Sequence, residues 1–294
     1  MNINNSLSHR NKEPESSVLY IVGTPIGNLD DISIRAINIL KNVSLIACED
    51  TRKTGRLLKH LNISNKLISL NEYSSLKKVD FLINMLDEGE SLAVVSDAGM
   101  PLISDPGESI VTEAIKNNLD VICVPGPCAA ITALISSGID TSKFTFYGFL
   151  PKKNLDRELI LKEISENDKT SIIYESPKRI IKLLTDLKNL CGGERKLVLL
   201  KELTKRYEKH FGDNINKVID NLKFCDPKGE YTLIISKSEK DKNEYLISNK
   251  DLIIDLQELI KAGLSNSSAA NYLSKKSGVP KNELYKLTIK NNLE

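Results

Sequence analysis

From Val18 onward, short runs of apolar residues alternate with amphipathic stretches. Residues 18–22 are apolar throughout and predict a buried strand that ends at Gly23. The next apolar side chains recur at every third position, as on one face of a helix, at Ile34, Ile37, Leu40 and Val43. Asp30 and Asp31 precede this periodic stretch and suit the N-terminus of the predicted helix.

The same alternation continues along the chain. Three more apolar runs predict strands, at residues 45–48, 92–95 and 121–124. Helices are expected between them, and one of these carries on a single face the side chains of Val79, Leu82, Ile83 and Leu86. A second series of strands is predicted at residues 144–147, 171–174, 197–200 and 231–235. Strands that alternate with helices are typical of an α/β fold with a largely parallel sheet.

Breaks in this pattern divide the chain into segments. Residues 1–17 are expected to form a disordered tail, and residues 148–151 suggest a hinge. The predicted domains are an N-terminal α/β domain and a C-terminal α/β domain, over residues 18–146 and 147–237. Residues 238–250 are polar and charged, as in a linker. The last segment, residues 251–294, predicts a small helical domain whose final two helices, joined through Gly278, resemble a helix-turn-helix.

Composition indicates the general class of protein but does not indicate what it binds. The chain has 294 residues, a net charge of +2 and 27% charged residues, which is typical of a globular protein of about two domains. Five Cys occur without a C-x-x-C pair, so neither a disulfide scaffold nor a zinc site is indicated, and no metal is expected. No run of about 18 apolar residues occurs, so no membrane contact and a cytoplasmic location are expected.

Four loops after the first-domain strands are rich in Gly, Pro and small polar residues, at residues 23–28, 49–55, 96–107 and 125–132. Ligands bind at the carboxyl ends of strands in open α/β sheets, so the four loops indicate one cleft. The alternative, that these residues only make turns, explains less well why Asp97 and Asp105 enclose an uncharged stretch. The spacing matches neither a P-loop nor the dinucleotide fingerprint, which disfavours an NTPase or an NAD enzyme.

The strings that fill these loops resemble the tetrapyrrole-methylase superfamily of S-adenosylmethionine (SAM) enzymes, and within it the bacterial 2′-O-ribose cytidine methyltransferases of small-subunit ribosomal RNA. The resemblance runs from about Leu19 to the C-terminus. Its most specific strings are Ser96-Asp97-Ala98-Gly99 and Glu49-Asp50-Thr51-Arg52. It implies the two-domain fold of class III SAM methyltransferases, with a cleft between the domains and a small helical C-terminal domain.

The resemblance also implies a cofactor site for SAM, without a metal. The residues implied to bind SAM are Pro25, Asp97, Gly99, Met100, Ile103, Ser104, Ala129, Thr132, Tyr174 and Glu175. Gly99 has no Cβ, so the backbone there can approach a ligand closely and offer free amides to a carboxylate. Asp97 can accept a hydrogen bond from the ligand's ammonium, although an aspartate in a loop often serves only to cap or turn the chain.

Residues 49–53 bring carboxylates and cations together directly after a strand. Glu49 and Asp50, together with Lys201, are the candidate catalytic groups. Three cations are the candidates for binding RNA phosphates: Arg52, Lys53 and Arg56. On a surface helix the same charges form a solvated face with a marginal ion pair, and that alternative stays open.

By resemblance, the acceptor is the ribose 2′-oxygen of a decoding-centre cytidine, cytidine 1402, of 16S ribosomal RNA. The expected partners are free 16S RNA or the 30S subunit, and a homodimer is implied by the superfamily. Two other classes stay open. One is a methylase of a tetrapyrrole precursor, and the other is a noncatalytic RNA-binding protein that uses the basic C-terminal helices, where five Lys face two Glu after residue 264.

Overall fold

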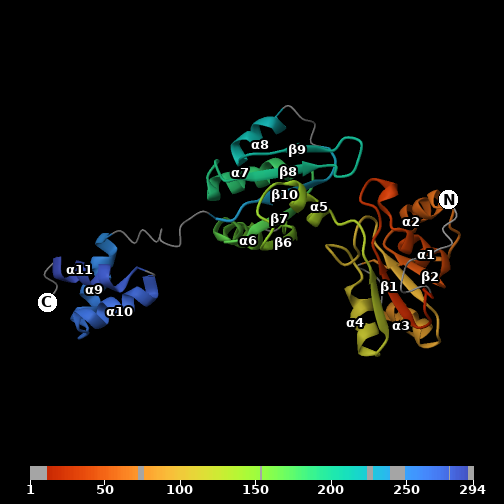
Figure 1. Ribbon diagram of the computed structural model, residues 1–294, viewed down its shortest axis with the longest axis horizontal. Coiled ribbons are helices and arrows are strands. Elements are labelled where there is room, and N and C mark those ends of the chain that lie inside the picture. Colours follow the sequence, from red (N-terminus) through yellow and green to blue (C-terminus); the bar gives the residue numbers. More distant parts are fainter. Residues whose placement is uncertain are drawn as a thin grey trace. The chain divides into compact units, whose positions relative to one another are not determined.

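A computed structural model describes residues 12–71, 76–152, 154–223, 228–238, 249–277 and 279–290. Its first sheet has five parallel strands in the order β3-β2-β4-β1-β5 (Figure 1). They are β1 (Val18–Val22), β2 (Leu45–Cys48), β3 (Leu67–Ser69), β4 (Leu92–Val95) and β5 (Asp120–Val124). β1, β2 and β4 are buried along their whole length, because helices cover both faces of the sheet. Apolar residues are favoured at every position of such strands.

The helices of this half are α1 (Ile34–Asn42), α2 (Thr51–His60), α3 (Leu76–Asp87) and α4 (Glu108–Lys116). α3 buries the four apolar side chains predicted for one face, against the sheet. The predicted start of α1 is wrong by a few residues. Asp30 and Asp31 lie in a 3-10 turn, η1 (Leu29–Asp31), and the cap is Ser33, whose hydroxyl accepts from the amide of Ala36 at 3.0 Å.

The second sheet has the order β6-β7-β10-β8-β9. Its elements follow α5 (Ala129–Ser136) and are β6 (Phe144–Phe149), α6 (Asn154–Glu166), β7 (Thr170–Glu175), α7 (Ile180–Cys191), β8 (Leu197–Lys201), β9 (Lys209–Phe211), α8 (Ile215–Leu222) and β10 (Tyr231–Ile235). Only the pair β6/β7 is parallel, and the other pairs are antiparallel. The expectation of a largely parallel sheet therefore holds for the first sheet alone.

The chain passes from the first sheet to the second earlier than predicted. Ala130, Ala133 and Leu134 of α5 pack in one cluster with residues of β7 and β10, so α5 belongs with the second sheet. The boundary predicted after residue 146, and the hinge predicted at residues 148–151, would both cut or end β6. The crossing is instead made by residues 125–128, directly after β5. Both sheets belong to one compact unit that ends at Ser236.

Part of the predicted tail is ordered. Glu13 forms an ion pair with Arg35 of α1 at 2.6 Å, and the amide of Glu15 donates to the phenol oxygen of Tyr20 at 2.8 Å. Residues 12–17 are therefore held against the first half of the unit, contrary to the expectation. The remainder of the predicted tail, residues 1–11, lies outside the described residues, as do residues 239–248 of the predicted linker.

The second compact unit, residues 237–294, contains α9 (Asn249–Lys261), α10 (Asn266–Ser277) and α11 (Lys281–Lys290). The three helices bury a small core of their own, made of Leu252, Leu256, Ala269, Ala270, Leu273 and Leu284. The predicted helices are present, although α9 begins inside the predicted linker. Gly278, on which the predicted turn depends, lies outside the described residues.

Candidate functional site

Glycines bring three loops of the first sheet into contact at its carboxyl edge. A Cβ at Gly23, after β1, would lie 2.7 Å from the Cα of Gly126, after β5. Thr24 and Gly99 form an isolated antiparallel bridge, in which each amide donates to the other residue's carbonyl at 2.9 and 3.1 Å. Gly23 and Gly126 can approach so closely because neither has a side chain, so glycine at these two positions fixes the contact between the two loops.

A cavity of about 520 Å³ lies between these loops and the second sheet. It is lined by eight of the ten residues predicted to bind the cofactor: Asp97, Gly99, Met100, Ile103, Ser104, Ala129, Tyr174 and Glu175. The other two are not part of this lining: Pro25 precedes the lining residue Ile26, and Thr132 lies three positions after Ala129. Lys53 and Glu49 also line the cavity, so charged groups from α2 and the end of β2 reach it.

Sequence reasoning missed the wall that β6 and β10 supply. Phe149 and Tyr231 line the cavity, and so does Glu230. Tyr231 of β10 pairs with Glu175 of β7 in antiparallel register, which brings the start of one strand beside the end of the other. A run of apolar residues does not reveal this register, because antiparallel and parallel neighbours bury similar side chains. Gly229, two residues before the start of β10, is a local signal of a close approach.

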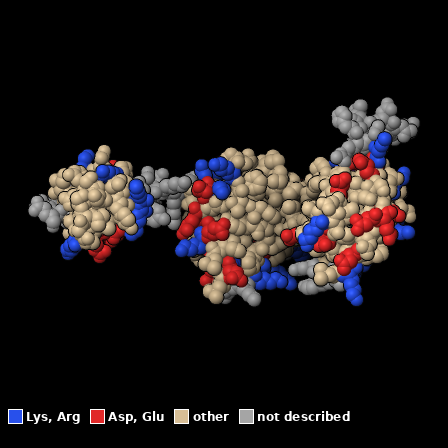
Figure 2. All heavy atoms as spheres, turned by 90° about the horizontal axis from the view of Figure 1, so that it is seen from below, with Lys and Arg blue, Asp and Glu red and all other residues tan. Residues whose placement is uncertain are grey.

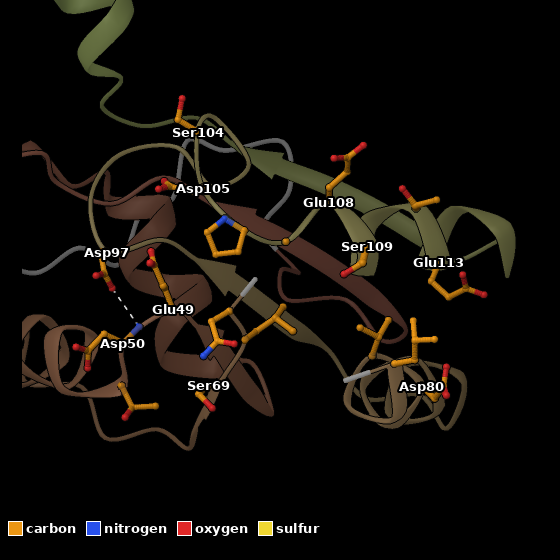
Figure 3. Close-up of a pocket in the computed structure, with 18 of the residues that line it drawn as sticks. Glu49, Asp50, Ser69, Asp80, Asp97, Ser104, Asp105, Glu108, Ser109 and Glu113 are labelled. Carbon is orange, nitrogen blue, oxygen red and sulfur yellow. Dashed lines mark hydrogen bonds between the residues drawn. The ribbon is translucent and has the colours of Figure 1, made fainter. Parts of the chain in front are cut away.

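A second, larger cavity of about 1250 Å³ adjoins the first at the carboxyl ends of β2, β3 and β4. Figure 3 shows Glu49, Asp97 and Asp105 gathered at one end of it, with Asp80 and Glu113 at the other. Four residues line both cavities: Glu49, Asp97, Ser104 and Asp105. This shared wall, hereafter the junction, is where a molecule in one cavity would face a molecule in the other.

Asp97 is held in the junction by two partners. One carboxylate oxygen accepts from the backbone amide of Asp50 at 3.1 Å, drawn as the dashed line in Figure 3. The other forms an ion pair with the ammonium of Lys53 at 2.7 Å, and this hydrogen bond raises the pKa of Lys53. The predicted RNA contact Lys53 is thus an internal partner of the predicted cofactor ligand.

Asp50 has a capping position at the start of α2. Its side chain accepts from the amide of Arg52 at 2.8 Å and forms an ion pair with that guanidinium at 2.7 Å. These hydrogen bonds hold the pKa of Asp50 far below its usual range. A carboxylate of such low basicity is a poor proton acceptor, which argues against the predicted catalytic role. Arg52 is 83% exposed and lines the larger cavity, whereas the exposed Arg56 lines neither cavity.

Glu49 and Asp105 have the opposite electrostatic setting. Burial raises the pKa of Glu49, and the nearby charge of Asp97 raises it further. Burial likewise raises the pKa of Asp105, to about 6, with Glu49 and Asp97 adding to the effect and a hydrogen bond from Ser96 opposing it. Crowded carboxylates of this kind hold protons nearer to neutral pH than isolated ones do. Glu49 and Asp105, with their raised pKa values, are therefore better suited to accept a proton than Asp50, whose pKa is lowered.

The remaining predicted residues have clear positions. Lys201, a predicted catalytic group, places its ammonium 5.6 Å from the ring centre of Tyr231 and lines neither cavity. Glu175 is 1% exposed, and one of its carboxylate oxygens is buried without a hydrogen-bond partner among the described residues. The amide of Gly99, expected to be free, donates to Thr24, so the free-amide expectation is wrong at that residue.

The face of the molecule drawn in Figure 2 shows no large patch of a single charge. Figure 2 shows Lys and Arg interspersed with Asp and Glu on the face drawn, in each part of the chain. Within the described residues, no group of three or more His, Cys, Asp or Glu is arranged to hold a metal ion. None of the helices in these described residues has the length and apolar character needed to cross a membrane.

Known proteins with similar sequences identify the family of this chain. The family model of tetrapyrrole (corrin/porphyrin) methylases matches residues 18–218. A ribosomal RNA small subunit methyltransferase I from Synechocystis sp. is 40% identical over 273 residues, which are 92% of this chain and 97% of that protein. A protein of the same name from Streptococcus pyogenes serotype M3 is 42% identical over 270 residues, or 92% and 94% of the two chains.

Among solved structures, a cobalt precorrin-4 methyltransferase of cobalamin biosynthesis superposes with a TM-score of 0.54. The match covers 75% of this chain and 95% of that chain, at 14% identity, and so shows a shared fold alone. The family model covers the first sheet and all of the second except β10, and the two relatives each match 92% of the chain. The chain therefore belongs to the tetrapyrrole (corrin/porphyrin) methylase family, in the group that contains the ribosomal RNA small subunit methyltransferases I.

Proposed function

We propose that this protein transfers a methyl group from SAM to the ribose 2′-oxygen of a cytidine in small-subunit ribosomal RNA. The observation that carries the proposal is the similarity to ribosomal RNA small subunit methyltransferase I over 92% of the chain, a share large enough to extend into the helical C-terminal unit. The family model, by contrast, ends at residue 218. A ribosomal RNA substrate therefore has support that a small tetrapyrrole substrate lacks.

The smaller cavity fits SAM by charge and by shape. Five carboxylates and a single lysine line it, so it suits a ligand with a positive sulfonium and ammonium. The carboxylates belong to Glu49, Asp97, Asp105, Glu175 and Glu230. Ile26, Met100 and Phe149 supply apolar surface for an adenine ring, and the volume lies within the range of small-molecule sites.

Glu175 lines the cavity as a largely buried carboxylate. One of its oxygens accepts from the amide of Ser176 and lies 3.4 Å from Arg179, and the other has no hydrogen-bond partner among the described residues. Glu175 and Asp97 would hold polar groups of SAM, and Met100, Ile103 and Ala129 would contact its adenosine. When bound, SAM supplies an intrinsically reactive methyl group, and the protein's own contribution is alignment, exclusion of water and removal of one proton.

The junction supplies the groups for proton removal. A ribose hydroxyl is weakly acidic and must lose its proton as the oxygen forms the new bond. Glu49 and Asp105 are the junction carboxylates that are not held as Asp97 is, by an amide and an ammonium. The larger cavity has the volume for a nucleotide, and Arg52 at its lining is suited to a phosphate. This arrangement orients the hydroxyl toward the smaller cavity.

The proposed function is tested by the position of a transferred label. The protein is incubated with methyl-tritiated SAM and 16S RNA, free or within 30S subunits, from cells that lack this protein. We expect label in an alkali-resistant dinucleotide, because a methylated 2′-oxygen cannot assist cleavage of the adjacent phosphodiester. RNA from cells that contain the protein is the control and should accept little label. A homodimer stays a prediction, which sedimentation of the same sample would check.

Three other results would overturn the proposal in distinct ways. Label released by alkali as a mononucleotide would place the methyl group on a base. Label in a tetrapyrrole precursor offered in place of RNA would support a small-molecule methylase. Binding of RNA without any transfer of label would support a noncatalytic role.

A further inference from the structure

We infer that the turn between β8 and β9, residues 202–208, is a surface that binds the RNA substrate, with Tyr207 stacked on an unpaired base; this rests on the proposed function. The turn leaves the second sheet at a defined edge (Figure 1). Glu175, Tyr231 and Lys201 lie in one row across β7, β10 and β8, and Lys209 of β9 extends that row. Glu175 and Tyr231 line the smaller cavity, so the turn begins at the edge of the sheet where that cavity lies.

Contacts on two sides hold the turn beside the cavity. The hydroxyl of Thr204 accepts from the amide of Asn28 at 3.1 Å. A Cβ at Gly27 would lie 2.7 Å from that hydroxyl oxygen, so the loop after β1 touches the turn directly. On the other side, the ammonium of Lys205 lies 3.0 Å from a carboxylate oxygen of Glu230, which lines the smaller cavity. A molecule bound to the turn is therefore held next to the wall of the cofactor site.

The backbone of the turn is fixed in a shape that its residues do not favour. Glu202 and Thr204 have φ values of +55° and +63°, in the left-handed region that is unfavourable for a β-branched residue such as threonine. The amide of Thr204 donates to a carboxylate oxygen of Glu208 at 2.6 Å, and the amide of Lys205 donates to the carbonyl of Glu202 at 3.0 Å. Such conformations persist where surrounding contacts enforce them, and they cluster at active sites and ligand contacts. The turn is therefore a preformed element.

The tip of the turn presents an aromatic ring with cations beside it. Tyr207 is 69% exposed, and no large aromatic side chain among the described residues is more exposed. The guanidinium carbon of Arg206 lies 5.6 Å from the centre of the Tyr207 ring. Lys209 is exposed as well, and neither Lys209 nor Arg206 forms an ion pair with a residue that the structure describes. An open aromatic ring can stack on a base while the cations contact phosphates.

The acidic residue of the tip is occupied by neighbours within the same hairpin. One carboxylate oxygen of Glu208 accepts from the amide of Thr204, and the other lies 2.7 Å from Nε2 of His210. The charges left for an incoming strand are thus the positive ones of Arg206 and Lys209. A positive surface that carries an aromatic ring fits a polyanion with unpaired bases, because single-stranded nucleic acid is bound by this combination of cations and stacking.

An unpaired segment of RNA fits this surface better than a duplex does. The bases of a duplex are stacked on one another, whereas the bases of a loop or bulge can turn outward and stack on aromatic or arginine side chains. Tyr207 therefore takes a base of a nucleotide that flanks the acceptor. This contact fixes the strand while the ribose of the acceptor reaches the junction.

Kinetic measurements on substituted proteins test the contact. Tyr207→Ala is expected to raise the KM for RNA at least about 5-fold, the loss expected for one stacked base, while the Kd for SAM and the melting temperature stay unchanged. Tyr207→Phe keeps the ring and should behave as the wild-type protein does. Arg206→Gln should weaken RNA binding and lower its salt dependence by the share of about one phosphate contact. The matched control is Phe144→Ala, at the end of β6 opposite to the cavity residue Phe149.

Fluorescence provides a second readout that does not depend on activity. The chain contains no Trp, so Tyr207→Trp introduces a single indole at the tip of the turn. Stacking on a base quenches indole emission, so RNA should quench Tyr207→Trp strongly and the control variant Phe144→Trp little. Free 16S RNA and 30S subunits are titrated separately. If quenching requires the 30S subunit, ultraviolet crosslinking from the same indole identifies whether RNA or a ribosomal protein is the partner.

Each result decides the inference. If the wild-type protein methylates RNA but Tyr207→Ala keeps its KM and Tyr207→Trp is not quenched, the inference is wrong and the proposed function stands. A crosslink to protein in place of RNA, or a loss of SAM affinity as large as the loss of RNA affinity, would also contradict it. If the wild-type protein transfers no label to RNA, the proposed function fails. Quenching by free RNA would then still support an RNA-binding turn, and its absence would overturn both.

Discussion

Replacing Gly126 with valine is expected to abolish SAM binding and to lower the melting temperature. A Cβ at Gly126 would lie 2.8 Å from the Cα of Gly23 and 2.9 Å from its carbonyl carbon. Both neighbours are backbone atoms that cannot rotate away, so the loops after β1 and β5 must separate. That movement would break the hydrogen bond of 3.1 Å from the amide of Gly23 to Val124 and open the wall of the cofactor cavity. Overpacking of this kind costs about 1–3 kcal/mol.

The matched control is Gly55→Ala in α2. The nearest atom to a Cβ there is the Cδ1 of Leu67 at 3.8 Å, which is ordinary contact. Alanine is favoured over glycine inside a helix by about 0.5–1 kcal/mol, so this variant should be slightly more stable and bind SAM normally. Thermal unfolding and titration calorimetry on both variants make the comparison. Normal SAM affinity in Gly126→Val would show that the glycine contact does not shape the cavity.

Removing residues 239–294 is expected to leave SAM affinity nearly unchanged and to reduce methylation of RNA more than about tenfold. Both cavities are lined by residues of the first compact unit, so the cofactor site stays complete. The removed unit is held together by its own core, because Leu252, Leu256 and Leu273 are buried among its helices. Its last 30 residues carry five Lys against two Glu, a net charge of +3 that suits contact with phosphates.

SAM affinity, melting temperature and RNA affinity should be measured on the same truncated protein, and RNA affinity at two salt concentrations. Loss of RNA binding with an unchanged melting temperature is the expected pattern, and the RNA affinity of the full chain should fall as salt rises. Unchanged RNA binding would instead place the main RNA contact in the first unit, near Arg52. A large fall in melting temperature would show that the second unit also stabilises the first, so that its leucines do more than form a core of their own.

The sequence predicts the first sheet well because its strands are buried and continuous. β1, β2 and β4 occupy the predicted apolar runs, since parallel strands covered on both faces leave no polar position to confuse the pattern. β3 and β9 were missed because each has three residues, too few for any periodicity. The antiparallel pairing of the second sheet was missed for a related reason, because strand direction is set by tertiary packing and leaves no mark on an apolar run.

The candidate site was predictable where the chemistry is local. The family resemblance implies ten cofactor residues, of which eight line the cavity, and six of those eight lie in the glycine- and proline-rich loops. The roles within the charged string at residues 49–53 were not predictable, because the partners lie far apart in sequence. Asp97 takes Lys53 from a loop 44 residues away, and Asp50 is occupied as a helix cap. Gly99 is another example: its φ of +86° strains any substitution, so a valine there would disturb the loop as well as the ligand.

The position of Ile26 bears on how the two sheets unfold. Ile26 lies in the loop that follows β1 of the first sheet. It is nevertheless only 8% exposed, and it packs in the same apolar cluster as Ala130, Leu203 and Ile234 around the second sheet. The neighbouring amide of Asn28 donates to the hydroxyl of Thr204 at 3.1 Å, in the turn after β8. Opening either sheet therefore strips apolar cover from the other, which makes the pair a single cooperative unit despite their separate strand ladders. The loop after β1, whose Ile26 lines the cofactor cavity, therefore also couples the unfolding of the first sheet to that of the second.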